Sequence, residues 1–282
     1  MKNNQQYDKN SWEVFETLPS FGRTFTLSLS WQVFEDLSPS YRKFIEEKYN
    51  TLELLLNEWD ESLHELGGDP TYYDWDNFRP LRLSREEDWS DWLVFLIDTS
   101  KTGVFAKELL QIDGFESKDY STNKIEREVS YKVYRADIII SWKKGAFSHI
   151  EVKIGDEDLL KTYKTGKMMR EKYKVKAVKW TDFLLLLSGQ SPRWEKIVEK
   201  NPSFSKIKAI TWNDVCIAIR KALMAGESIK WKVWAHSFLG AAEQKLIGFL
   251  GHKMKMGPRF SILNIGNIVE KTDILKKGLN ND

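Results

Sequence analysis

Apolar residues recur at intervals of three and four over positions 29–66, and this spacing predicts an amphipathic helix. A Ser-Pro-Ser sequence at 38–40 has the composition of a helix start, and a glycine pair at 67–68 that of a helix end. Residues 69–80 are aromatic and rich in turn-forming types, so we expect a loop there. The helical apolar positions are Phe44, Leu52, Leu55, Leu56, Trp59, Leu63 and Leu66.

A second helix is expected directly after this loop. Ser84 is followed three residues later by Glu87, which is the spacing of a capping box. A shorter helix is expected around Phe105–Leu110. The apolar side chains that share one face of the longer helix are Trp89, Trp92, Leu93 and Leu96.

After about residue 124 the pattern changes to runs of β-branched and aromatic residues, which are typical of strands. The expected strands are 125–131, 134–142, 147–154, 180–188 and 206–212. The run at 180–188 is continuously apolar, which suits a strand buried on both faces. Helices are expected over 157–173, 215–224 and 231–251, before a polar, basic tail that starts at residue 253.

This order of elements indicates an α/β fold, in which a mixed sheet forms the core. An acidic, mainly helical N-terminal extension is expected over 1–80 and the α/β core over 81–226. A C-terminal helical region with the basic tail would occupy 227–282. The three segments form either separate units or one compact domain.

Composition excludes several classes of protein. Hydrophobic residues make up 41% of the 282 positions and charged residues 30%, which excludes a disordered chain. A single cysteine, Cys216, excludes a disulfide framework and a cysteine-rich zinc site. No apolar run approaches the roughly 20 residues that span a bilayer, and the first ten residues have no signal-like apolar segment. We therefore expect a protein of the reducing cytoplasm without membrane contact.

The net charge of +2 conceals two regions of opposite charge. Residues 44–78 hold ten acidic residues and one lysine, whereas residues 141–181 hold eleven basic and five acidic residues. A charged segment is usually a solvated surface, and this is one interpretation of both regions. The alternatives are a protein partner for the acidic segment and nucleic acid for the basic one.

The basic region contains a predicted hairpin with two carboxylates. If residues 143–145 form a three-residue loop, with Gly145 in the left-handed conformation, Asp137 lies directly opposite Glu151. Side chains alternate along a strand, so Lys153 shares the face of Glu151, as does His149. The other face would belong to the core and carries Ile138, Ile140, Trp142, Ile150, Val152 and Ile154.

Two carboxylates that face each other across a strand pair repel, and a divalent cation between them reverses that effect. Oxygen ligands of this kind suit Mg²⁺ or Mn²⁺. The Glu-x-Lys spacing alone has little meaning, but only Glu151 lies in an apolar strand that follows another strand with an aspartate. The competing interpretation is a set of cross-strand ion pairs on a half-exposed hairpin.

Asp137 together with Glu151-Val-Lys153 resembles the PD-(D/E)xK nuclease superfamily, which has the restriction-endonuclease-like fold. The core order of that family, αβββαβ, matches residues 85–188. The resemblance implies that Asp137 and Glu151 bind Mg²⁺ and that Lys153 assists phosphodiester hydrolysis. The aspartate of the family often follows proline, and this chain has Ala136 there.

Further residues are candidates for supporting roles. In the resembled family an additional carboxylate often comes from the first helix or strand, which suggests Glu87 or Glu128, with Glu108 as a weaker choice. Glu87 could instead be an ordinary capping residue, and Glu128 an ordinary exposed strand residue. Basic residues that could contact phosphates, or simply form a solvated surface, are Arg135, Lys161, Lys164, Lys167 and Arg170.

These observations predict a metal-dependent nuclease that uses Mg²⁺ or Mn²⁺. We expect DNA in preference to RNA because most members of the resembled family act on DNA. Restriction, phage defence and DNA repair are all compatible settings. The alternative is a non-catalytic subunit that keeps the nuclease fold and binds nucleic acid or protein, with a homo-oligomer or a protein partner bound through the acidic N-terminal region.

Overall fold

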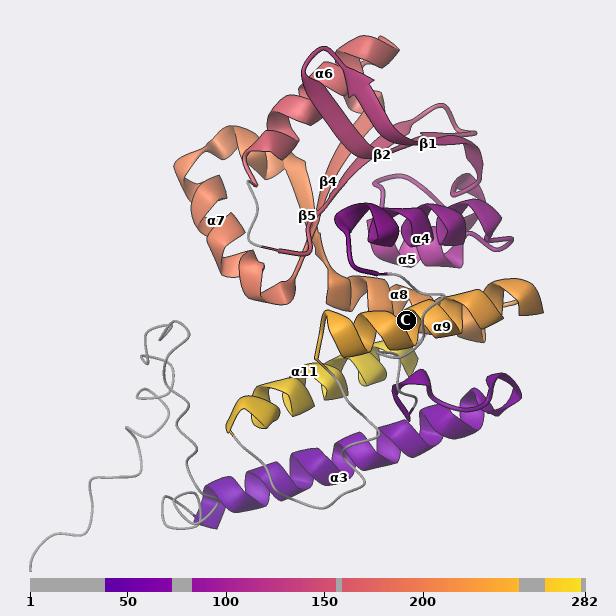
Figure 1. Cartoon of the computed structure of the whole chain (residues 1–282), viewed down its shortest axis with the longest axis vertical. Coiled ribbons are helices and arrows are strands. Elements are labelled where there is room, and N and C mark those ends of the chain that lie inside the picture. The colour runs from indigo at the N-terminus through magenta and orange to yellow at the C-terminus, as the bar shows by residue number, and fades with distance from the viewer. Residues whose placement is uncertain (1–38, 73–82, 156–158, 249–261, 280–282) are drawn as a thin grey trace, which may run out of the picture.

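The computed structural model describes residues 39–72, 83–155, 159–248 and 262–279. Its centre is a five-stranded mixed sheet with the strands in chain order (Figure 1). The first three strands pair antiparallel with one another, and the last two run parallel to the third. The strands are β1 (Thr122–Tyr131), β2 (Tyr134–Trp142), β3 (Phe147–Val152), β4 (Trp180–Leu186) and β5 (Ile207–Thr211). The α/β class with a mixed sheet is therefore confirmed.

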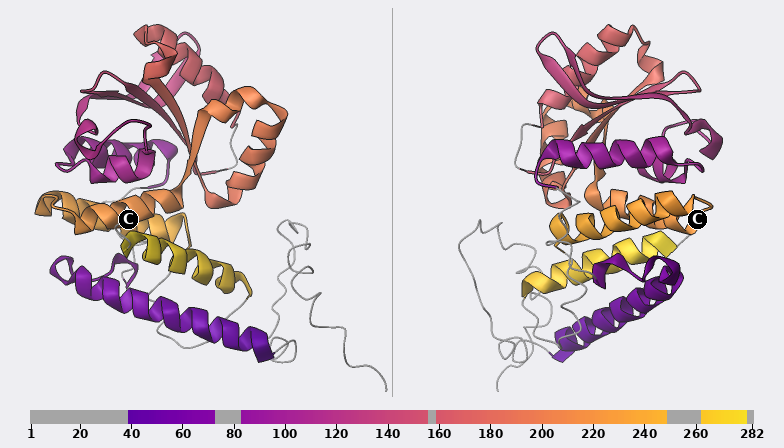
Figure 2. Two further views of the ribbon diagram at one scale, coloured as in Figure 1. Left: turned by 180° about the vertical axis from the view of Figure 1, so that it is seen from behind. Right: turned by 45° about the vertical axis from the view of Figure 1, so that its right-hand side comes forward.

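Helices cover both faces of this sheet. On one face α4 (Glu86–Thr99) and α5 (Val104–Leu110) pack against Ile138, Ile140 and Ile150 in the main hydrophobic core. On the other face α6 (Lys161–Tyr173) inserts Met169 between side chains of β1 and β2. Figure 2 (right) shows α4 below the sheet and α6 above it. Ile138 and Ile140 of β2 face α4, whereas Ile139 between them faces α6. This follows from the alternation of side chains along a strand, as the hairpin pattern predicted.

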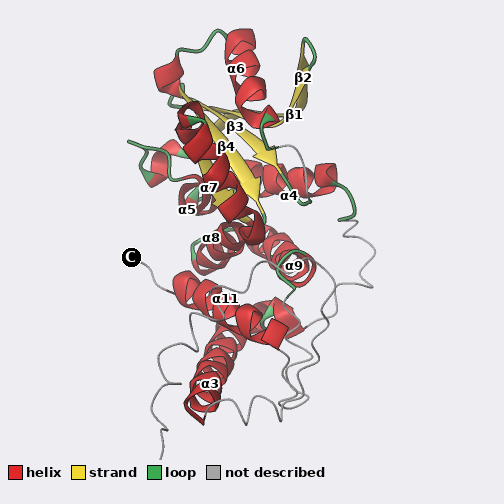
Figure 3. Cartoon of the chain, turned by 90° about the vertical axis from the view of Figure 1, so that its left-hand side faces the viewer, coloured by secondary structure: helices red, strands yellow, loops and turns green. Residues whose placement is uncertain are grey.

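A layer of four helices lies beyond α4 and α5 and contains segments from both ends of the chain (Figures 1 and 3). These helices are α3 (Pro39–Ser62), α8 (Trp212–Met224), α9 (Ile229–Lys245) and α11 (Ile262–Leu279). The N-terminal α3 packs against the C-terminal α11, and α11 packs against α8. One continuous hydrophobic core runs from Leu52 to Leu275 and joins the three predicted segments.

A buried group of four charges joins this helical layer. The guanidinium of Arg220 lies 2.7 Å from Asp69 and 2.9 Å from Glu243, and Lys271 also contacts Glu243. All four side chains are fully buried, and the Arg220 guanidinium stacks on Trp59, 4.7 Å from its ring centroid. Asp69 lies in the turn after α3, and the other three side chains lie in α8, α9 and α11. The charges therefore balance only when all four segments are in place.

Most predicted elements are confirmed, and several details are wrong. The helix expected from residue 157 begins at Lys161, and the helix over 191–200 (α7, Ser191–Lys200) was not predicted. The expected polar tail contains α11, which buries Ile268, Ile274 and Leu275. Residues 1–38, 73–82, 249–261 and the first residues of the predicted 157–173 helix lie outside the described residues.

The cap of α4 is a further correction. The backbone N–H groups of Ser84 and Arg85 donate to the Asp88 carboxylate, at 3.1 and 3.0 Å. Asp88, one residue beyond the predicted Glu87, therefore closes the capping box because the helix begins at Glu86. Among the described helices, none has the length and apolarity that a bilayer crossing requires.

Candidate active site

The hairpin between β2 and β3 has the predicted geometry. Gly145 has φ of 79°, and the Trp142 N–H donates to the Ala146 carbonyl at 2.9 Å. Four residue pairs follow in the predicted register, ending with Ile138 opposite Ile150. The pairing register of β2 and β3 is determined locally, because it is set by the length of the loop and by its glycine.

The predicted pairing of Asp137 directly opposite Glu151 is not part of this ladder, and the Asp137 side chain contacts the main chain of β3 instead. Its Oδ2 accepts a hydrogen bond from the Val152 N–H at 2.8 Å. Burial, together with the negative charge of Glu151, raises the pKa of Asp137 to about 6. The two predicted metal ligands are therefore close enough to repel each other, at the carboxyl end of β3.

Glu151 is 0% exposed, and its two oxygens face different cations. Oε1 lies 3.2 Å from the Lys153 ammonium, and Oε2 lies 3.5 Å from Nε2 of His149. Neither ion pair has the geometry of a hydrogen bond, so both buried oxygens lack a hydrogen-bond donor among the described residues. Burial would raise the pKa of Glu151, but the opposing effects of His149, Lys153 and Lys161 hold it below the usual range.

Lys153 is held between two carboxylates. Its Nζ lies 3.0 Å from Oε1 of Glu86 and 3.2 Å from Glu151, and only 5% of the residue is exposed. The Trp212 indole N–H donates to the Lys153 carbonyl at 3.0 Å and fixes the main chain there. The ammonium group is thus placed at the same strand end as the two carboxylates.

Glu86 was not among the predicted site residues, although a signal for it exists. It lies three residues before the buried Trp89 and seven before the buried Leu93, so it shares their face of α4. Glu87, which was predicted, points elsewhere and lies 3.4 Å from Arg135. The helical period, applied to the acidic run itself, would have selected Glu86.

His149 has a larger part in the site than its expected role as a neighbour. Its Nδ1 lies 2.9 Å from Oδ1 of Asp182, which is its ladder partner on β4. Burial would lower the pKa of His149, but Asp182 and Glu151 together raise it to about 9. The imidazole is therefore cationic at neutral pH and lies between two carboxylates.

The charges of this cluster leave an excess of negative charge. Among the described residues, four carboxylates face two cationic side chains, a formal charge of −2 when all four are ionised and before the nearby Lys161 is counted. A divalent cation would neutralise it. The side chains are Glu86, Asp137, Glu151 and Asp182, with His149 and Lys153.

The donors fit a magnesium-type site better than a zinc-type site. Within the described ranges, no three His, Cys, Asp or Glu side chains are grouped as a metal-binding set. Asp137 and Glu151 offer a pair of carboxylates, and the buried Glu151 oxygens have unused acceptor capacity. Mg²⁺ is commonly held by one or two carboxylates, with water and substrate phosphate as the other ligands.

The other predicted residues divide into two groups. Glu87 and Glu128 both lie beside Arg135, at 3.4 and 3.9 Å, so these two candidate acids partly neutralise that arginine. Glu128 has φ of 48° and interrupts the β1–β2 ladder at the level of Asp137. Glu108 is instead paired with Lys221, at 2.9 Å.

The basic residues of α6 lie on its solvent side. Lys161, Lys164 and Lys167 are exposed, and Arg170 is half-buried. The opposite side of the helix is buried and carries Thr162, Thr165, Gly166 and Met169. Because the positive charge of Lys161 lowers the pKa of Glu151, the first turn of α6 lies near the carboxylates.

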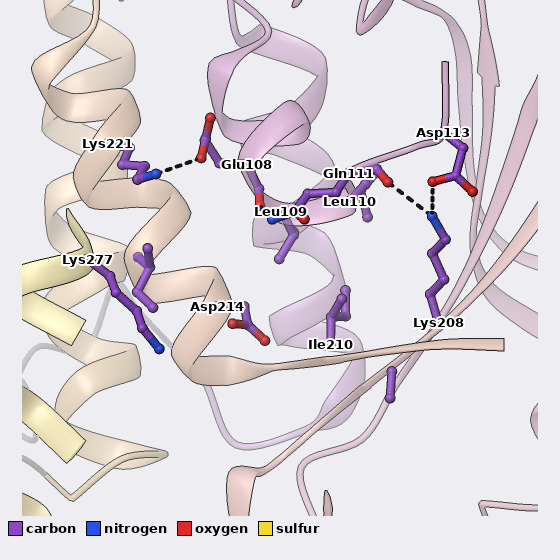
Figure 4. A pocket seen from close by; sticks show the side chains of 12 residues that line it. Glu108, Leu109, Leu110, Gln111, Asp113, Lys208, Ile210, Asp214, Lys221 and Lys277 are labelled. Carbon is purple, nitrogen blue, oxygen red and sulfur yellow. Dashed lines mark hydrogen bonds and ion pairs between the residues drawn. The ribbon is translucent and has the colours of Figure 1, made fainter. Parts of the chain in front are cut away.

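A separate cleft of about 700 Å³ lies between α5, β5, α8 and α11 (Figure 4). Its charged side chains largely pair with one another: Lys221 contacts Glu108, and Lys208 contacts Asp113 and the Gln111 carbonyl. The residues that line it include none of the carboxylate cluster at the end of β3. The candidate site is therefore the largely buried group of side chains at the end of β3 and not this cleft.

No family model, curated protein or solved structure matches the chain, so its function has to be argued from the geometry of this site.

Proposed function

We propose that the protein is a metal-dependent nuclease with a restriction-endonuclease-like core. The single observation that carries the proposal is the set of three side chains at the end of the β2–β3 hairpin. Asp137 and Glu151 are close enough to repel, and the buried oxygens of Glu151 have no hydrogen-bond donor in the described structure. Lys153 lies beside them, held by Glu86.

The arrangement of elements around this site agrees with the family that the sequence resembles. When the short α5 between α4 and β1 is left aside, the order α4, β1, β2, β3, α6, β4 is the αβββαβ order of that family's core. In this comparison Asp137 and Glu151 correspond to its metal ligands and Lys153 to its lysine. The correspondence is one of element order and motif position.

The residues present define what each would do in phosphodiester hydrolysis. Asp137 and Glu151 would hold Mg²⁺ or Mn²⁺, which, when bound, polarises a phosphoryl oxygen and lowers the pKa of a bound water. The Lys153 ammonium would orient the attacking water or stabilise the negative charge that develops on the phosphate oxygens. Water adds to phosphorus, the bond to the leaving oxygen breaks, and that oxygen takes up a proton.

DNA is the preferred substrate class because most members of the resembled family cleave it. The exposed lysines of α6 begin next to the carboxylates, which suits contacts to phosphates on either side of the scissile bond. Arg135 is a weaker candidate for such a contact because Glu87 and Glu128 already lie beside it.

One observation favours the alternative of a non-catalytic binding subunit. His149 and Lys153 already compensate the charge of Glu151 within the fold, as a bound metal would. Such a subunit could use the acidic outer side of α3 for a protein partner, since Glu46, Glu47, Glu53 and Glu58 are exposed there.

The test is an incubation of the purified protein with supercoiled plasmid, linear duplex DNA, single-stranded DNA and RNA. Each substrate is given Mg²⁺, Mn²⁺ or a chelator. The proposal expects cleavage of DNA with either metal and none with the chelator. Binding of DNA without cleavage of any substrate would favour the non-catalytic subunit.

A further inference from the structure

A line of polar groups runs from Glu151 on β3 towards β4, away from Asp137 on β2. It consists of the buried Glu151, the buried His149 on β3 and Asp182 on β4, whose side chain is 20% exposed. The Asp182 carboxylate lies 2.9 Å from Nδ1 of His149, and Nε2 of His149 lies 3.5 Å from Oε2 of Glu151. We propose that Asp182 and His149 are positioning residues that fix the Glu151 carboxylate as a metal ligand. The inference rests on the proposed function.

The strands hold this line in place. His149 and Glu151 are two residues apart on β3, so their side chains lie on the same face. Asp182 is the ladder partner of His149 on β4, which is an interior strand of the sheet. The imidazole ring is therefore hydrogen-bonded at Nδ1 to the neighbouring strand, its Nε2 makes a longer ion-pair contact with Glu151 on its own strand, and its side chain is fully buried.

The Asp182 carboxylate is itself restrained from two sides. The Trp180 indole N–H donates to the same Oδ1 that His149 contacts, at 2.8 Å. Gly166 of α6 lies against this carboxylate, and a side-chain carbon at position 166 would overlap Oδ1. A glycine at this point of α6 thus allows the helix to approach the sheet without displacing Asp182.

This arrangement matches the way outer groups support a metal ligand in proteins. A ligand that is oriented by a second group binds its metal more tightly, and loss of that second group typically weakens binding by about 10- to 100-fold. Here His149 is the only imidazole next to the candidate ligands among the described residues, and Asp182 fixes its orientation. Because neither is a candidate metal ligand, their effect would pass through Glu151.

The experiment measures Mn²⁺ binding to the full chain by titration calorimetry, for the wild type and for His149→Gln, Asp182→Asn and the double variant. His236→Gln is the matched control, since His236 is also buried and its Nε2 lies 2.7 Å from the Gly68 carbonyl, within the helical layer. Circular dichroism and thermal melting establish that each variant is folded. Asp182→Asn keeps the shape of the side chain and serves if His149→Gln does not fold.

We expect the Kd for Mn²⁺ to rise by about 10- to 100-fold in each single variant and to remain within about twofold of wild type in His236→Gln. The double variant should match the weaker single variant, because both residues act through one carboxylate. Cleavage lost in the single variants should return at higher Mn²⁺ concentration. A role in packing alone would lower the melting temperature and leave the Kd unchanged.

Two results would overturn the inference while the proposed function stands. One is a wild type that binds Mn²⁺ and cleaves DNA, beside folded variants with an equal or lower Kd. The other is a double variant whose loss is the product of the two single losses, which would mean independent actions. A wild type that binds no Mn²⁺ and cleaves nothing would instead reject the proposed function itself.

Discussion

Replacement of Asp137 by asparagine should stabilise the metal-free protein at neutral pH. Burial and the charge of Glu151 raise the pKa of Asp137 from 3.8 to about 6. When the pKa of an acid is higher in the folded state than in the unfolded state, the free energy of unfolding of the protein decreases as the pH rises from the lower to the higher of these two values. At about 1.4 kcal/mol per pKa unit, the ionised carboxylate costs at most roughly 3 kcal/mol above pH 6.

Asparagine removes this charge and keeps an oxygen that can accept the Val152 N–H. We therefore expect Asp137→Asn to raise the free energy of unfolding by about 1–3 kcal/mol at pH 7. The gain should shrink towards zero as the pH falls from 6 to 4, since the wild-type carboxylate then takes up its proton. The gain at pH 7 and its loss at lower pH both follow from the buried charge of Asp137.

The assay is urea unfolding in a chelator at pH 7 and at about pH 4.5. Asp113→Asn is the control, because the Asp113 side chain is 92% exposed and its replacement should change stability by less than about 0.5 kcal/mol. An Asp137→Asn variant that is less stable than wild type at pH 7 would refute the reasoning. So would a gain of equal size at both pH values, because repulsion between ionised carboxylates cannot produce it.

Three further predictions concern the chemistry, the binding of substrate and the fold. Lys153→Ala should lower the single-turnover cleavage rate about 100-fold or more while DNA affinity changes little, and a loss below tenfold would remove Lys153 from the chemistry. Simultaneous charge reversal at Lys161, Lys164 and Lys167 should weaken DNA binding, measured by fluorescence anisotropy. The slope of log affinity against log salt concentration should become shallower by about 0.9 for each phosphate that these lysines neutralise in the wild type. An unchanged slope would assign these lysines to plain solvated surface. Arg220→Met should lower the free energy of unfolding by about 3–5 kcal/mol in urea titrations, because two buried carboxylates would keep a single cation, and a loss below about 1 kcal/mol would contradict that account.

The hairpin could be predicted from the sequence because all its determinants are local. Gly145 sets the loop, and alternation then places Asp137, Glu151 and Lys153 at one strand end with Ile138 and Ile140 of β2 on the other face. Strand alternation is strict, so an error of one residue in register would have moved every side chain to the wrong face.

Residues contributed by distant segments could not be predicted in this way. Glu86 comes from α4 and Asp182 from β4, and their approach to Lys153 and His149 depends on how α4 and β4 pack against β3. The helix start was also misplaced by a single residue, which moved the expected capping role from Asp88 to Glu87.

The C-terminal segment failed as a prediction for a different reason. Its lysines and polar residues resemble a solvated tail, yet α11 buries one side against α3 and α8. Lys271 is fully buried there beside Glu243. A charged residue in a core position carries no apolar signal, so its partner must be known before its burial can be inferred.

The central claim is that Asp137 and Glu151 hold a divalent cation that is required for phosphodiester cleavage. Its most direct test is the cleavage of supercoiled plasmid in Mg²⁺ by the wild type and by folded Asp137→Ala and Glu151→Ala variants, purified side by side. Cleavage by the wild type alone, abolished by a chelator, is the result that we predict. Equal cleavage by the wild type and either variant would contradict the claim, because the activity would then come from another site or a contaminant.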